Sequence, residues 1–219
     1  MWTKICGITN LTDAETVAAS AADAIGLNFY APSKRYVAPA TAATIRELIG
    51  DRLEVVGVFV NSTAVEVAAV CHQVGLDTVQ FHGDESTELI AEFHQLAPEI
   101  KIIRAYRVSP AGFADVENSL AALATARVPT KAILVDAYRP GEFGGTGHQV
   151  NPELVRDWTA PNRLPVILAG GLRPDNVAIA VNIAQPWGVD TASGVEIQPG
   201  VKSLAKIRAF VTEAQASQG

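Results

Sequence analysis

The sequence predicts a (β/α)8 barrel of the TIM type, formed by a single domain over residues 1–219. Short apolar runs rich in β-branched residues alternate strictly with longer segments that carry apolar residues at positions i, i+3 and i+4. Such alternation implies parallel strands with right-handed crossovers, and eight such units can close into a barrel. A chain of 219 residues, 48% of them hydrophobic, has the usual size for one barrel of this kind.

The predicted strands are residues 3–6, 24–29, 54–60, 77–81, 101–106, 131–136, 165–170 and 188–192. The predicted helices are residues 11–21, 40–50, 63–74, 86–96, 112–126, 152–158, 174–183 and 203–215. Several of the strands are near-continuous apolar runs, which is typical of strands buried on both faces. A doubly wound open sheet shares this alternation, but the count of eight favours closure, and no G-x-G-x-x-G motif follows the first strand.

Composition and charge narrow the classes of function. The chain has 17 basic and 23 acidic residues, a net charge of −6, and no stripe of Lys or Arg that would bind nucleic acid. Its apolar stretches are too short to span a membrane, and no signal segment follows Met1, so we expect a cytoplasmic protein without a membrane partner. Cys6 and Cys71 have no partner at zinc-finger spacing and are expected to be free thiols, with no metal site.

In a barrel of this type the active site lies where the strands end and the following loops begin. Cys6 ends the first strand, and Asp136 ends the apolar sixth strand. A thiolate can act as a base or nucleophile, and a carboxyl group can act as an acid. From position alone, Cys6 could also be a small buried hydrophobic residue, and Asp136 a hydrogen-bonded structural residue.

Polar residues also follow the second and fourth strands. Arg35 lies on an extended loop between Pro32 and Pro39, where its guanidinium could bind a carboxylate or be a solvated surface charge. Gln80 and His82 stand at the end of the fourth strand and are candidates for binding substrate. His82 could orient a ligand or cap the next helix.

The loops after strands seven and eight form the recurring phosphate site of these barrels, where small residues let backbone amides approach an anion. A third glycine-rich segment, residues 144–147, follows strand six. Tight turns without a ligand would have a similar composition. The candidates for phosphate binding are Gly145, Gly170, Gly171, Asp190, Ser193 and Gly194.

Several motifs resemble those of the phosphoribosylanthranilate isomerase family of tryptophan biosynthesis. They occur in the family's order along almost the whole chain: KICGIT at 4–9, VGVFVN at 56–61, VQFHGDE at 79–85, ILVDAY at 133–138, GGTG at 144–147, LAGGLRPDNV at 168–177 and VDTASGVE at 189–196. The resemblance implies an aldose–ketose isomerase that performs an Amadori rearrangement of a phosphorylated small molecule. It implies that Cys6 is the general base, Asp136 the general acid and Arg35 the ligand of the anthranilate carboxylate.

The resemblance also implies that no cofactor is required, because the iminium intermediate is itself an electron sink. Oligomeric state stays open between monomer and homodimer. Three alternatives remain at this stage: a metal-dependent epimerase, a synthase that uses Lys4 as its acid, and a barrel that senses a phosphorylated metabolite without catalysis.

Overall fold

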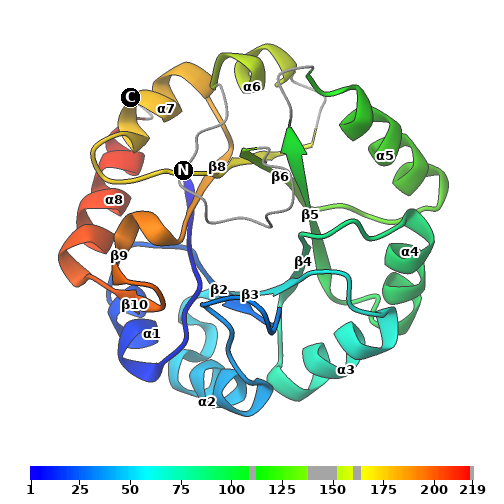
Figure 1. The fold of residues 1–219 in the computed structure, drawn as a ribbon, viewed down its shortest axis with the longest axis horizontal. Coiled ribbons are helices and arrows are strands. Elements are labelled where there is room, and N and C mark those ends of the chain that lie inside the picture. The colour runs from blue at the N-terminus through cyan, green and yellow to red at the C-terminus, as the bar shows by residue number, and fades with distance from the viewer. Residues whose placement is uncertain (109–111, 138–151, 160–163, 218–219) are drawn as a thin grey trace.

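The computed structural model describes residues 1–108, 112–137, 152–159 and 164–217, and it contains the closed parallel barrel that the sequence predicts (Figure 1). Each strand pairs in parallel with the next along the chain, and β8 pairs with β1 to close the sheet. The barrel strands are β1 (Trp2–Cys6), β2 (Ala24–Asn28), β3 (Glu54–Phe59), β4 (Thr78–Phe81), β5 (Lys101–Val108), β6 (Ala132–Ala137), β7 (Val166–Leu168) and β8 (Gly188–Thr191).

The helices form a ring around the barrel (Figure 1). They are α1 (Leu11–Ala18), α2 (Pro39–Ile49), α3 (Ala64–Val74), α4 (Thr87–Leu96), α5 (Ala114–Thr125), α6 (Pro152–Trp158), α7 (Val177–Ala184) and α8 (Leu204–Ala216). Two short 3-10 helices, η1 (Gly50–Arg52) and η2 (Ser193–Val195), follow α2 and β8. None of the helices that the structure describes combines the length and hydrophobicity needed to cross a bilayer.

Local sequence signals explain where helices begin and end. Helix α3 starts with a capping box, in which Thr63 accepts from the backbone amide of Glu66 and the Glu66 side chain accepts from that of Thr63. It ends at Gly75, whose φ of 75° is the left-handed conformation that glycine adopts without strain. Helix α7 begins at Val177 instead of the predicted residue 174, because the Asn176 side chain accepts from the Arg173 amide and closes a turn first.

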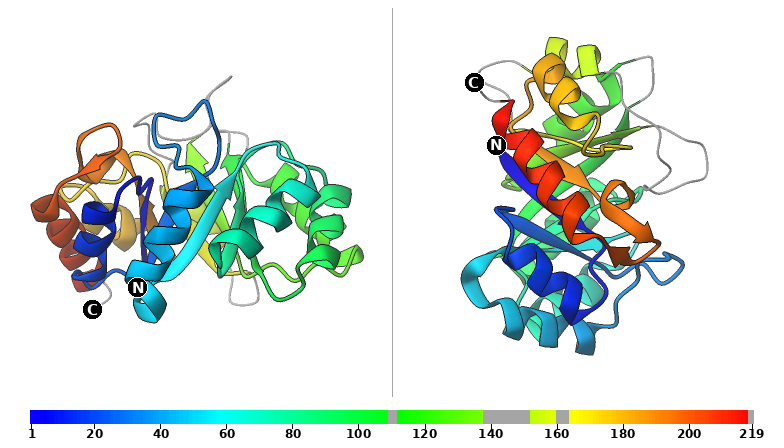
Figure 2. Two further views of the ribbon diagram at one scale, coloured as in Figure 1. Left: turned by 90° about the horizontal axis from the view of Figure 1, so that it is seen from below. Right: turned by 90° about the vertical axis from the view of Figure 1, so that its left-hand side faces the viewer.

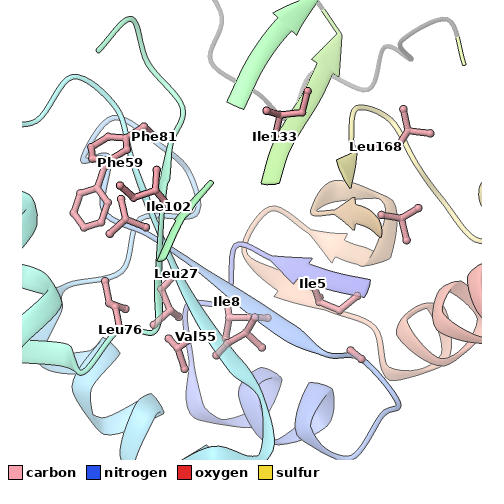
Figure 3. Close-up of a cluster of buried hydrophobic side chains, with 14 of the residues drawn as sticks. Ile5, Ile8, Leu27, Val55, Phe59, Leu76, Phe81, Ile102, Ile133 and Leu168 are labelled. Carbon is pink, nitrogen blue, oxygen red and sulfur yellow. The ribbon is translucent and has the colours of Figure 1, made fainter. Parts of the chain in front are cut away.

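Two hydrophobic layers hold the barrel. The outer layer lies between sheet and helices and includes Ile5, Leu27, Phe59 and Phe81 (Figure 3). The inner layer fills the barrel and consists of Ala24, Val56, Ile103, Ala105, Ala132, Leu134, Ile167 and Ala169. Because successive side chains of a strand point to opposite faces, the inner layer and the polar residues that end the strands share one face of the sheet.

A hairpin that the sequence did not predict follows β8. It consists of β9 (Glu196–Gln198) and β10 (Val201–Lys202), which pair antiparallel with a register shift. In the left view of Figure 2 this hairpin (orange) and the loop between β2 and α2 (blue) stand at the same end of the barrel. The hairpin is anchored to the loop after β1, because the Thr9 hydroxyl donates to the carbonyl of Gly200 at 2.8 Å.

At the opposite end of the strands, Glu54 at the start of β3 joins three strands. Its carboxylate accepts from Lys131 Nζ at 2.5 and 2.6 Å and from the Thr78 hydroxyl at 2.5 Å. Burial acts to raise the pKa of Glu54, but these hydrogen bonds and the Lys131 charge outweigh it and hold the pKa below its ordinary value of 4.5. The ionised carboxylate is therefore the form that stabilises the fold.

We predict that Glu54→Gln lowers the free energy of unfolding by about 1–3 kcal/mol at neutral pH. Because the pKa is lower in the folded state than in the unfolded state, this contribution is present above the ordinary pKa and is lost as pH falls through the folded value. Urea unfolding of the wild type and Glu54→Gln should therefore show a difference in the free energy of unfolding that becomes smaller at acidic pH. Glu47→Gln, at an exposed position of α2, should show little change at any pH; a gap independent of pH would contradict the assignment.

Candidate active site

One cavity at the carboxyl ends of the strands collects most of the residues that the sequence singled out. Gly194 lies beside it in η2, and Gly145 falls outside the described residues. Asn28, Tyr30, Ser33 and Thr191, which sequence reasoning did not assign, line it as well. The predicted residues that line the cavity are Cys6, Arg35, Gln80, His82, Asp136, Gly170, Gly171, Asp190 and Ser193.

Cys6 and Asp136 approach the cavity from different sides of the barrel, at the end of β1 and near the end of β6. Cys6 is partly exposed, whereas Asp136 is 6% exposed. The thiol packs against Gly26 of β2, where an added Cβ would lie 2.6 Å from Sγ. The absence of a side chain at Gly26 therefore leaves the space that the Cys6 sulfur occupies.

Gln80 and His82 extend the polar wall toward Asp136. Gln80 Nε2 lies 2.6 Å from His82 Nδ1, so the amide donates and the ring nitrogen accepts. The ring proton then resides on Nε2, which lies 3.5 Å from Asp136 Oδ2. This arrangement orients the imidazole edge toward the carboxyl group and leaves Gln80 Oε1 buried without a hydrogen-bond partner among the described residues.

Arg35 is held by a partner that the sequence did not identify. Its Nε and Nη2 donate to Glu196 Oε1 and Oε2 at 2.8 and 2.7 Å. The aliphatic part of Arg35 crosses Gly7, where a Cβ would lie 2.5 Å from Arg35 Cδ, so glycine is needed there for close approach. An Arg facing a cavity needs a counter-charge, and Glu196 in the SGVE segment was the available signal.

Two cations, Arg35 and Lys202, stabilise the buried Glu196 carboxylate. Burial acts to raise the pKa of Glu196, but hydrogen bonds and charges from Arg35 and Lys202 hold it below its usual value. The hydrogen bond to Glu196 raises the pKa of Arg35. The Lys202 ammonium also donates to the backbone carbonyls of Cys6 at 2.6 Å and Ala192 at 3.0 Å. The β9–β10 hairpin is thereby joined to the ends of β1 and β8.

Asp190 has a cationic neighbour of its own. Its Oδ1 lies 2.8 Å from Nζ of Lys4, which is fully buried inside the barrel. The two residues are directly opposite each other in the β1–β8 register. Because the carboxylate faces this ammonium, the prediction that Asp190 belongs to a phosphate site rests only on its position near the end of β8.

The loops after β7 and β8 are in close contact. Gly170 and Gly171 have φ values of 87° and 64°, which favour glycine. At Gly194 an added Cβ would lie 1.9 Å from the carbonyl oxygen of Leu172, and the Thr191 hydroxyl donates to that same oxygen at 2.8 Å. The hydrogen bonds of the described residues leave the amides of Gly170, Gly171, Ser193 and Gly194 unused.

Unsatisfied buried polar atoms gather at this end of the barrel. Native proteins rarely leave such atoms without partners, so a cluster of them indicates a place where a ligand or water completes the hydrogen bonds. Of the six such atoms among the described residues, Gln80 Oε1 and His82 Nε2 belong to residues that line the cavity, whereas Lys4 Nζ and Asp190 Oδ1 lie 2.8 Å apart as an ion pair. Within the residues that the structure describes, no group of three or more His, Cys, Asp or Glu residues is arranged to hold a metal ion.

Fold and cavity together define a TIM-barrel enzyme with a thiol and a carboxyl group facing one polar cavity. A family model described as N-(5'-phosphoribosyl)anthranilate (PRA) isomerase matches residues 3–213. The chain therefore belongs to this family.

Individual relatives agree with the family match. The chain is 42% identical over 214 residues to an N-(5'-phosphoribosyl)anthranilate isomerase of Chlorobium chlorochromatii, covering 97% of this chain and 95% of the relative. It resembles the crystal structure of phosphoribosyl anthranilate isomerase from Thermotoga maritima with a TM-score of 0.84 and 36% identity, over 99% of both chains. A further similar structure, at TM-score 0.79 and 35% identity over 99% of both chains, is such an isomerase in complex with reduced 1-(o-carboxyphenylamino)-1-deoxyribulose 5-phosphate.

We predict that Gly194→Ala separates the loops after β7 and β8, because the new methyl group would overlap the Leu172 carbonyl. The cost should be about 1–3 kcal/mol of stability, measured by urea unfolding, together with weaker protection of the fold by inorganic phosphate. Gly50→Ala is a control for the phosphate effect: nothing lies within 4 Å of its added Cβ, so its φ of 55° alone would cost stability and phosphate protection should be unchanged. Equal phosphate protection in Gly194→Ala and wild type would show that the loop contact does not matter for the anion.

Proposed function

We propose that this protein converts N-(5'-phosphoribosyl)anthranilate to 1-(2-carboxyphenylamino)-1-deoxyribulose 5-phosphate in tryptophan biosynthesis, with Cys6 as general base and Asp136 as general acid. The observation that carries the proposal is that both residues, which are far apart in the chain, line one cavity. Membership of the isomerase family supports the same reaction.

The reaction requires two proton transfers on the ribose. Protonated Asp136 donates to the ring oxygen, which breaks the bond from C1′ to that oxygen and gives an open-chain iminium. The Cys6 thiolate then accepts the proton from C2′, and the electron pair of that C–H bond neutralises the iminium to form an enolamine. Tautomerisation moves the enol proton to C1′ and yields the ketone, and a proton passes through solvent from the Cys6 thiol to the Asp136 carboxylate to reset the site.

His82 and Gln80 support the acid in this scheme. With its Nδ1 accepting from Gln80, the imidazole presents Nε2–H toward Asp136 at 3.5 Å and can stabilise the carboxylate that forms when the proton leaves. The buried Gln80 Oε1 is free to accept from a substrate hydroxyl within the described part of the site. Both residues would therefore serve substrate binding, as their position at the end of β4 predicts.

Phosphate and anthranilate would occupy opposite ends of the substrate. The amides of Gly170, Gly171, Ser193 and Gly194 would bind the phosphate oxygens, with Gly145 as a further predicted contact. Binding at this remote group orients the reacting carbons without taking part in proton transfer.

Arg35 would bind the anthranilate carboxylate. Glu196 occupies its Nε and Nη2, so the orientation of the guanidinium is fixed, and Nη1 is not used by the described hydrogen bonds. A charge-assisted hydrogen bond from this nitrogen is the contact expected for a substrate carboxylate.

Other readings of the sequence find less support. The synthase alternative needs Lys4 at the mouth, but Lys4 is fully buried and is not among the residues that line the cavity. A cytoplasmic location and a monomeric or homodimeric state are further parts of the proposal and are tested by cell fractionation and by sedimentation.

Following the loss of substrate fluorescence tests the reaction directly. We predict that Cys6→Ala and Asp136→Asn each reduce turnover by about 10²–10⁴-fold or more, because each removes one proton transfer. Substrate affinity should be largely kept. Cys71→Ala is the matched control, since Cys71 is a buried thiol of α3. Normal turnover by Cys6→Ala would exclude it as the base, and no turnover by wild type would exclude the reaction.

Arg35→Ala should raise KM by about 10–100-fold with a smaller effect on kcat, because it removes a charge-assisted contact made in both ground and transition states. Arg35→Lys keeps the positive charge, so its KM should lie between those of the wild type and Arg35→Ala. Steady-state kinetics of the three proteins checks this order. An unchanged KM in Arg35→Ala would leave the ion pair with Glu196 as the only role of this guanidinium.

A further inference from the structure

Lys4 is a buried cation that the proposed reaction does not use. It lies in the middle of β1 with an exposure of 0%, two residues before Cys6 and on the same inward face of the sheet. Its Nζ contacts Asp190 at 2.8 Å, but the geometry is not that of a directed hydrogen bond. A buried ammonium without well-formed hydrogen bonds is costly, so a structural role alone explains it poorly.

The charged groups around Cys6 are not balanced. Among the described residues, three cations lie near it: Lys4 from the same strand, Arg35, whose side chain crosses the adjacent Gly7, and Lys202, whose Nζ donates to the Cys6 carbonyl at 2.6 Å. Two carboxylates pair with these cations, Asp190 with Lys4, and Glu196 with both others.

No other carboxylate of the described residues forms an ion pair with these three cations. Gly26, which touches the sulfur from β2, has no charge. Asp13 accepts from the backbone amide of Lys202 and is not paired with its ammonium among the described residues. His82 and Asp136 face the same cavity and contact each other. The three cations and the two carboxylates that pair with them therefore sum to one positive charge, which a thiolate at position 6 would neutralise.

Lys4 and Cys6 also interact electrostatically. Burial lowers the pKa of Lys4, but the Asp190 carboxylate and negative charge on Cys6 outweigh it and raise the pKa to about 12. Burial lowers the pKa of Lys202, and negative charge on Cys6 opposes this; for Arg35 it adds to the larger effect of the hydrogen bond to Glu196, which raises the pKa. An interaction that favours the ammonium beside a thiolate favours the thiolate beside the ammonium by the same free energy.

From this geometry we infer that Lys4 is a positioning residue that holds Cys6 as a thiolate, while Asp190 fixes the ammonium beneath it. Lys4 does not touch substrate. Its effect on catalysis would come from the fraction of enzyme in which the base is ready to accept a proton. This deepens the proposed function, since it explains how the thiol assigned as base becomes ionised, and it gives Asp190 a role within the barrel.

The thiolate can be measured without substrate. Its ultraviolet absorbance is titrated against pH in wild type, Lys4→Met, Lys4→Arg and Asp190→Asn, and the titration of Cys6→Ala is subtracted from each. Cys71 does not interfere, because burial raises the pKa of its thiol to about 12. The rate of alkylation by iodoacetamide at neutral pH gives a second measure of the thiolate fraction.

In Lys4→Met we expect alkylation about tenfold slower than in wild type, the midpoint of thiolate formation moved to higher pH, and a lower kcat with KM largely kept. Lys4→Arg should restore most of the alkylation rate. Asp190→Asn should shift the midpoint the opposite way, because it removes the anion that competes for the ammonium. Lys101→Met, an exposed position at the start of β5, is the control and should match wild type.

An unchanged midpoint and alkylation rate in folded Lys4→Met would overturn the inference. If Lys4→Met does not fold, a midpoint in Asp190→Asn that stays in place or moves to higher pH would overturn it equally. Because these measurements need no substrate, a thiolate controlled by Lys4 in a protein without isomerase turnover would refute the proposed reaction and leave this inference standing.

Discussion

Closure of the sheet between β1 and β8 is the constraint on which the site depends. The register pairs Lys4 with Asp190 and so brings the first strand of the chain beside the last. Cys6, the next inward residue of β1, then lies at the rim together with the loops after β7 and β8. In an open sheet these two strands would be edges, and the thiol, the glycine-rich loops and the hairpin could not face a common cavity.

The fold could be predicted almost completely from the sequence, because a strand buried on both faces and a helix with one apolar stripe leave different periodicities. Strand ends were less certain: β5 continues to Val108, past the predicted residue 106, and β7 ends at Leu168 because Gly170 and Gly171 take left-handed φ values. The β9–β10 hairpin was missed, since two strands of three and two residues carry no measurable pattern.

The sequence predicts which residues line the candidate site, but it does not predict which of their charged side chains pair with one another. Polar residues at strand ends identify Cys6, Asp136, Arg35 and His82, because a parallel barrel leaves such residues few alternative positions. Which charge pairs with which depends on side-chain geometry across distant segments. The pairing of Arg35 with Glu196 joins residues 161 positions apart, so the sequence shows both charges but not that they pair.

The short β9–β10 hairpin carries two charged residues that determine the charge around the site. Glu196 and Lys202 pair across it at 2.9 Å, and between them they reach Arg35 and the backbone of Cys6. Residues 196–202 thus determine the electrostatic environment of two separate loops, the loop after β1 and the loop that carries Arg35. A longer or shorter hairpin in an engineered barrel would change both the charge near the Cys6 thiol and the orientation of the Arg35 guanidinium. These two properties would therefore change together.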